Sequence, residues 1–301
     1  MTCAPEDRKY KPIALLCGTN RCTEVLMIPS LTLNTGASMP YLGLGLFKIT
    51  DQSVMDRTVN DALSMGYRLF DTASVYRNEA ELGNTLMYCG VPREELFITT
   101  KVWNTAQRIG NIEDALDRSL ERLRLDYVDL YLIHWPVPGC YLDTWLKMEK
   151  IFRSGRARAI GVSNFTSREL NDLLLHSDVV PAVNQIEYHP LYNQEETRAF
   201  CAGHGIAVQA ASPLARGTYL GMNNLTRLAE KYHRSEAQIG LRWLIQKGVG
   251  AIPKTVRTDR LLENTQVFDF ELTEDEMMIL DSLNENYRIS GIPEDLTPYH
   301  R

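Results

Sequence analysis

Eight short apolar segments, each followed by a stretch of helical length, constrain the fold of this chain more than any other feature. Strands that alternate with helices form parallel sheets, because each helix carries the chain back to the end of the sheet where the next strand starts. The predicted strands are residues 41–46, 68–71, 96–99, 128–133, 157–162, 182–186, 207–210 and 250–252.

Two parallel architectures fit this alternation, a doubly wound sheet and a closed barrel. A dinucleotide-binding doubly wound sheet needs G-x-G-x-x-G after its first strand. The nearest match here is Gly43-Leu-Gly45, which is followed by Leu46, Phe47 and Lys48. A chain of 301 residues also suits an α/β barrel built as a single domain. We therefore expect an α/β fold, a (β/α)8 TIM barrel.

The segments outside the barrel are predicted as follows. Residues 30–39 alternate apolar and polar side chains around Asn34-Thr35-Gly36, a pattern typical of a β-hairpin. We expect this N-terminal hairpin to cap the barrel bottom. Residues 1–27 read as an irregular extension, and residues 28–301 as one domain.

Helix starts carry recognisable signals at three places. Asp51 precedes an amphipathic run that ends at Gly66, and Ser167 precedes a second amphipathic run. Ser235, with Gln238 three residues later, matches a capping box.

Composition excludes several classes of partner. The net charge of −6 is unfavourable for general nucleic-acid binding, which requires clustered cations. No apolar run approaches the roughly 20 residues of a membrane span, and the patch at residues 13–16 is too short for a secretion signal. The 6 cysteines are scattered and predict reduced thiols in the cytoplasm. Cys17 and Cys22 have no matching ligand cluster, so we expect no metal site.

Polar side chains follow the predicted strands at the positions where a (β/α)8 barrel carries its chemistry. Taken singly, each has an ordinary explanation as a turn residue, a buried histidine or a solvated charge. Together they would surround one mouth of the barrel. They are Asp71, Lys101, His134, Ser163, Asn164, Gln185, Glu187, Ser212 and Lys254.

Tyr76, five residues after Asp71, adds a proton donor to this set. A phenol with a pKa near 10 is a weak acid at neutral pH, and a nearby Lys101 would lower that pKa. Asp71 could keep the lysine charged and oriented. His134 could direct a substrate carbonyl and share its developing charge. This chemistry suits hydride transfer to a carbonyl.

Six segments resemble the signature blocks of the aldo-keto reductases, in family order. The resemblance runs from about Ile28 to Leu283 and is strongest for the branch of 2,5-diketo-gluconate reductase and prostaglandin F synthase. The blocks are Phe70-Asp-Thr-Ala-Ser-Val-Tyr-Arg-Asn-Glu79, Thr99-Thr-Lys-Val-Trp103, Ile133-His-Trp-Pro136, Ile160-Gly-Val-Ser-Asn-Phe165, Asn184-Gln-Ile-Glu-Tyr-His-Pro190 and Ile252-Pro-Lys-Thr-Val256.

The resemblance implies an oxidoreductase with a catalytic tetrad and a nicotinamide cofactor. The tetrad is Asp71, Tyr76, Lys101 and His134, with Tyr76 as general acid. Ser163, Asn164 and Gln185 would bind the nicotinamide carboxamide. Lys254, Thr255 and Arg260 match 2′-phosphate contacts, and Glu263 and Asn264 match adenine contacts; Ser212, Leu214 and Val256 complete the implied cofactor set. NADPH is therefore expected, with NADH as a weaker alternative.

The substrate side of the mouth carries the departures from the family. Where the family usually stacks an aromatic ring on the nicotinamide, this chain has Ala211. Phe47, Trp103 and Trp135 are expected to line the pocket, although packing alone would also explain them. The short connection 136–145 and the modest C-terminal tail predict an open site.

Three interpretations of the function remain, and the last is the weakest. The first is a monomeric reductase of small-molecule aldehydes, dicarbonyls, sugars or keto compounds. The alternative is a regulatory protein that keeps the fold and the cofactor, as the potassium-channel β subunits do. A barrel without cofactor is weaker, because the phosphate-site residues oppose it.

Overall fold

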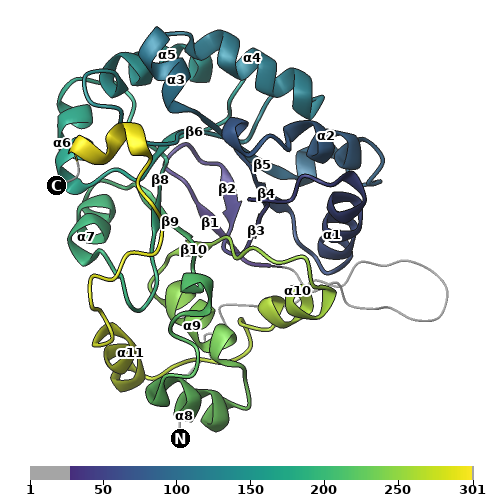
Figure 1. Cartoon of the computed structure of the whole chain (residues 1–301), viewed down its shortest axis with the longest axis vertical. Helices are drawn as coiled ribbons and strands as arrows, with labels where there is room; N and C mark the ends of the chain where they lie inside the picture. Colours follow the sequence, from purple (N-terminus) through teal and green to yellow (C-terminus); the bar gives the residue numbers. More distant parts are fainter. Residues whose placement is uncertain (1–27, 300–301) are drawn as a thin grey trace, which may run out of the picture.

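The computed structural model describes residues 28–299 and shows a closed (β/α)8 barrel (Figure 1). Parallel strands pair in sequence order, and a bridge between Leu42 and Ala251 joins the first to the last. The Gly43 N–H donates to the Ala251 carbonyl at 2.9 Å across this seam. The strands are β3 (Leu44–Gly45), β4 (Leu69–Asp71), β5 (Phe97–Val102), β6 (Leu130–Ile133), β7 (Ile160–Ser163), β8 (Val183–Glu187), β9 (Ala207–Ala211) and β10 (Gly250–Ala251). The predicted fold is confirmed.

Helices form the outer ring of the barrel (Figure 1). Their apolar sides face inward; on α4 these are Ile112, Leu116, Leu120 and Leu123, all buried. The helices are α1 (Gln52–Ser64), α2 (Glu79–Met87), α3 (Asn104–Ile109), α4 (Ile112–Leu123), α5 (Tyr141–Arg153), α6 (Ser167–Leu175), α7 (Glu195–Gly203), α8 (Asn223–Tyr232), α9 (Glu236–Gln246), α10 (Thr258–Thr265) and α11 (Glu274–Asp281).

Two of the expected helix starts are confirmed, and one is displaced by a residue. Asp51 caps α1 by accepting from the Val54 N–H, and Ser235 forms the capping box of α9. At α6 the cap is Thr166 rather than Ser167, because Thr166 stands three residues before Glu169 and forms a capping box with it.

A two-stranded hairpin closes the bottom of the barrel, as predicted. Its strands are β1 (Ser30–Thr32) and β2 (Ser38–Pro40), and Gly36 at the turn has φ +82°, a conformation that favours glycine. Leu33 and Met39 are buried in a cluster with first residues of the barrel strands, including Leu69, Phe97 and Leu130. Figure 1 shows the hairpin behind the ring of strands.

The structure also bears on the membrane spans, metal ligands and cysteines that were considered from composition. Within residues 28–299, no helix is long and apolar enough to cross a membrane. The same residues contain no cluster of metal-ligating side chains. Cys89, Cys140 and Cys201 are free thiols. The predicted extension 1–27, with Cys3, Cys17 and Cys22, lies outside the described residues.

Candidate active site

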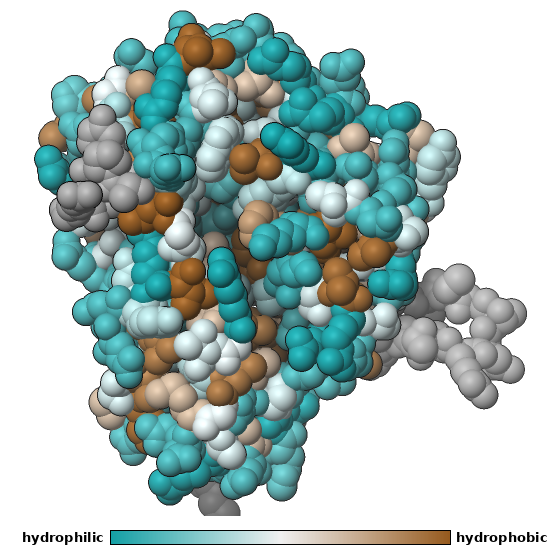
Figure 2. All heavy atoms as spheres, viewed as in Figure 1, coloured by the Kyte–Doolittle hydropathy of each residue, from teal (hydrophilic) through white to brown (hydrophobic). Residues whose placement is uncertain are grey.

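The polar strand ends meet in one large cleft of about 1180 Å³ at the mouth of the barrel. Figure 2 shows this face hollowed near its middle. Thirteen of the predicted site residues line the cleft. They are Asp71, Tyr76, His134, Ser163, Asn164, Gln185, Glu187, Ser212, Leu214, Lys254, Phe47, Trp103 and Trp135.

Lys101 and Asp71 form a buried ion pair below the cleft. β5 extends past the predicted end of its strand, so Lys101 lies within it and is fully buried. Its ammonium donates to Asp71 Oδ1 at 2.6 Å and to the Thr72 carbonyl at 2.9 Å. Burial lowers the pKa of Lys101, but Asp71 and Tyr76 outweigh burial and raise it. Lys101 is therefore cationic at neutral pH beneath the loop that carries Tyr76.

Tyr76 ends a single turn, η1 (Ser74–Tyr76), and its ring lies 5.1 Å from the Lys101 ammonium. Burial raises the pKa of the phenol, and Lys101 only partly offsets this, so the net direction is upward. Lys101 thus lowers the phenol pKa as expected, but desolvation, which the sequence did not reveal, is larger. The phenol is protonated at neutral pH, the form that a proton donor needs.

Asn78 fixes the loop that carries Tyr76. The side chain of Asn78 is fully buried. Its Nδ2 donates to the carbonyls of Leu46 and Ile49 at 2.8 and 2.9 Å, and its Oδ1 accepts from Thr72 Oγ1 at 2.6 Å. One side chain thereby joins the loop after β3 to the loop after β4.

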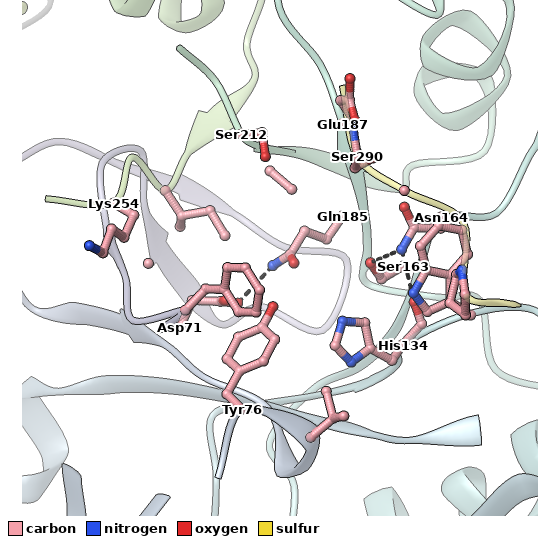
Figure 3. A pocket seen from close by; sticks show the side chains of 18 of the residues that line it. Asp71, Tyr76, His134, Ser163, Asn164, Gln185, Glu187, Ser212, Lys254 and Ser290 are labelled. Atoms are coloured by element: carbon pink, nitrogen blue, oxygen red, sulfur yellow. Dashed lines mark hydrogen bonds between the residues drawn. The ribbon is translucent and has the colours of Figure 1, made fainter. Parts of the chain in front are cut away.

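His134, directly after β6, faces Tyr76 across the cleft (Figure 3). Its ring meets Tyr76 and Trp103 edge-on, with centroids 5.6 and 5.1 Å apart. Burial and the charge of Lys101 hold the pKa of His134 well below 6.5, so the imidazole is neutral at pH 7. Its buried Nδ1 has no hydrogen-bond partner among the described residues.

The three residues implied for the carboxamide are held by hydrogen bonds from within the site (Figure 3). Asn164 has a positive φ of 64°, and its Nδ2 donates to the His134 carbonyl at 2.9 Å and to Ser163 Oγ at 3.1 Å. Gln185 donates from Nε2 to Asp71 Oδ2 at 2.8 Å. The site is therefore organised before any ligand binds.

Three cationic side chains, which follow β3, β9 and β10 in the chain, line the cleft. Lys48, Arg216 and Lys254 are exposed lining residues, and the described residues provide no carboxylate partner for them. Three cations without an ion-pair partner among residues 28–299, on a chain with net charge −6, favour an anionic ligand here. Arg257 differs, because it pairs with Asp259.

Six predicted residues lie outside the cleft lining. Lys101 sits behind Asp71 and Tyr76. The others follow β10 into α10, where Arg260 is exposed and the Glu263 carboxylate accepts from Ser235. The structure thus does not bring this group onto the cleft, although Lys254 connects the two. The group is Thr255, Val256, Arg260, Glu263 and Asn264.

The three aromatic residues that were predicted to line the pocket do line the cleft. Phe47 is 46% exposed, and its ring lies 4.9 Å from Tyr76. Trp135 lines the cleft and also packs against Val137 and Leu296, so it serves both pocket and core. Trp103 is half-buried beside His134.

The C-terminal segment supplies a wall of the cleft that sequence reasoning missed. Residues 290–295 line it, and Figure 1 shows this yellow segment running along the barrel mouth. Glu187 holds the segment by accepting from the Ile289 and Ser290 N–H groups, both at 2.7 Å. Asp295 binds Arg108 at its far end. The tail has no periodic pattern that could have revealed this; Lys48, Val75 and Arg216, also missed, have only their positions after strands.

Comparison with known proteins agrees with this fold. The aldo/keto reductase family model matches residues 41–285. The chain belongs to this family of oxidoreductases. It is 46% identical over 267 residues to glyoxal reductase of Bacillus subtilis (strain 168), covering 89% of this chain and 97% of that protein.

Solved structures give the same family. An aldo/keto reductase from Brucella melitensis superposes with a TM-score of 0.82 at 41% identity, covering 86% of this chain and all of the other. A Bombyx mori aldo-keto reductase, solved in complex with NADP, gives a TM-score of 0.83 at 37% identity, covering 88% of this chain and 96% of the other.

Proposed function

We propose that the protein reduces aldehydes and ketones with NADPH, and that Tyr76 is the general acid. The observation that carries this proposal is the buried Lys101–Asp71 pair beneath a protonated phenol that faces a neutral imidazole. A carbonyl between Tyr76 and His134 would accept two hydrogen bonds. These bonds strengthen as negative charge develops on its oxygen.

Two groups of residues in and beside the cleft support NADPH as the cofactor. Ser163, Asn164 and Gln185 present hydrogen-bonding groups to a carboxamide, and among residues 28–299 no donor occupies Gln185 Oε1. Lys48, Arg216 and Lys254 would hold the phosphates, with Arg260, Thr255, Glu263 and Asn264 beyond them toward α10. The bound dihydronicotinamide supplies the hydride. Lys254, Thr255 and Arg260, which match the family's 2′-phosphate contacts, favour NADPH over NADH because only NADPH carries that phosphate.

In this mechanism Tyr76 donates its proton to the carbonyl oxygen as the hydride reaches the carbon. Lys101 stabilises the phenolate that remains, and Asp71 keeps Lys101 in place. His134 directs the carbonyl oxygen toward the phenol. Since His134 is neutral, it donates a hydrogen bond without delivering a second proton.

The aromatic side chains that line the cleft indicate the substrate class. Phe47, Trp103 and Trp135 favour apolar or planar carbonyl compounds, and the glyoxal reductase relative makes small dicarbonyls the first substrates to try. We also propose that the protein is a monomer. A cytoplasmic location is supported by the described cysteines, which are free thiols, as a reducing compartment would keep them.

The test is Tyr76→Phe, assayed by NADPH oxidation with glyoxal and an aromatic aldehyde. We expect kcat to fall by about 10²–10⁴-fold, the usual contribution of a general acid, with NADPH binding retained. Tyr88→Phe, at a residue that is 84% exposed, is the matched control and should leave kcat unchanged. Near-normal turnover of Tyr76→Phe would remove Tyr76 from this role. NADPH binding by the wild type without turnover of any carbonyl would favour the regulatory alternative.

A further inference from the structure

A row of buried polar side chains runs through the barrel from the bottom hairpin to the catalytic ion pair. Gln209, in β9, is fully buried and does not line the cleft. Its Oε1 accepts from Gln185 Nε2 at 2.7 Å, and its Nε2 approaches the Met39 sulfur at 3.7 Å. The same Gln185 nitrogen donates to Asp71 Oδ2 at 2.8 Å, and Asp71 Oδ1 accepts from Lys101.

The donor and acceptor atoms of the neighbouring groups fix how each amide in this row is oriented. A primary amide offers two N–H donors on one side and an acceptor oxygen on the other. Gln185 faces two acceptors, the Asp71 carboxylate and the Gln209 oxygen, so its nitrogen must point toward both. A turned Gln185 amide would place its oxygen against a carboxylate. Gln209 keeps its own oxygen toward Gln185 because its nitrogen contacts Met39.

The consequence concerns the remaining atom of Gln185. Both of its N–H groups are used within the row, and none of the described residues donates to its Oε1. Gln185 also lines the cleft (Figure 3). Its oxygen is thus the atom that the side chain can offer to an N–H donor of a ligand.

We propose that Gln209 is a positioning residue of this site, which holds the Gln185 amide so that its oxygen faces the carboxamide of the cofactor. The inference rests on the proposed function. Asp71 alone fixes only one of the two N–H groups of Gln185. Without Gln209, the second would be a buried donor lacking a partner, and the amide would lose its single orientation.

The test compares two nucleotides on the folded protein. Gln209→Met keeps the length of the side chain but removes the acceptor. NADPH carries the carboxamide, whereas adenosine 2′,5′-bisphosphate carries only the adenosine and phosphates. We expect Gln209→Met to raise the Kd of NADPH about fivefold, which corresponds to one hydrogen bond of about 1 kcal/mol, and to leave the Kd of the bisphosphate unchanged.

Controls separate this inference from other effects. Leu33→Val disturbs the same end of the barrel but leaves the Gln185–Gln209 hydrogen bond and the Gln209–Met39 contact in place, so both Kd values should stay at wild type. Gln209→Leu replaces Gln209→Met if the latter does not fold. Equal weakening of both nucleotides, or no weakening of either, overturns the role of Gln209. A wild type that binds neither nucleotide refutes the proposed function itself.

Discussion

Glu187 lies at the end of β8 and anchors the C-terminal wall of the cleft, so its charge should be worth a measurable part of the stability. Its side chain is 2% exposed. Burial raises its pKa, but hydrogen bonds from His189 and from the Ile289 and Ser290 N–H groups outweigh burial and lower the pKa from 4.5 to about 2. At about 1.4 kcal/mol per pH unit, this difference corresponds to roughly 3 kcal/mol of folding free energy.

The pH dependence has a definite sign. A carboxylate whose pKa is depressed by folding stabilises the native state fully above its unfolded pKa of 4.5, and this contribution disappears as the pH falls toward about 2. Glu187→Gln keeps the shape of the side chain but removes the charge. We expect the free energy of unfolding to drop by up to roughly 3 kcal/mol at pH 7, the difference to shrink by about half at pH 3, and the two proteins to converge as the pH approaches 2.

The assay is urea unfolding of both proteins across this pH range. Asp295→Asn is the matched control, since Asp295 holds the same segment through an ion pair with Arg108 whose side chains are 43% and 38% exposed. Solvent screening limits that pair to less than about 1 kcal/mol. A loss for Glu187→Gln that is equally large at pH 3 and pH 7 would refute the electrostatic reasoning, because a packing defect does not titrate.

Three further substitutions test how the surrounding residues support the site. Gly161→Ala should cost more than about 3 kcal/mol in urea unfolding, since the added Cβ would lie 2.4 Å from the Val183 carbonyl oxygen; a mild loss would mean that β7 and β8 can separate. Asn78→Ala should remove about 2–4 kcal/mol of stability and lower kcat, because three buried hydrogen bonds that orient the Tyr76 loop are lost; unchanged kcat in the folded variant would contradict this positioning. Ala211→Tyr should lower the Kd of NADPH in a fluorescence titration by placing a ring beside the nicotinamide, whereas unchanged affinity would mean that another group covers it.

The sequence was informative wherever the signal is local. The alternation of short apolar runs with helical stretches was enough to predict a barrel, because the hydrophobic repeat that distinguishes a strand from a helix can be read within each segment. Polar residues after strands could be assigned to one mouth, because all parallel strands of a barrel end on the same side. Strand ends were less certain: β5 includes Lys101, which the periodic pattern had placed after it.

Contacts between distant segments came only from the tertiary structure. Glu187 binds N–H groups about 100 residues later in the chain, and the hydrogen bond from Gln185 to Asp71 spans 114 residues. No local pattern predicts which side chains meet inside a closed barrel. The tail that lines the cleft has no periodicity at all.

Protonation was likewise decided by the fold. The sequence placed a lysine near a tyrosine and predicted that the lysine lowers the phenol pKa; Lys101 does so, but the burial of Tyr76 sets the net direction upward. The sequence by itself determined which groups could take part in the chemistry. Only the folded structure determined how much water surrounds each group, and the loss of that water sets the balance between desolvation and charge.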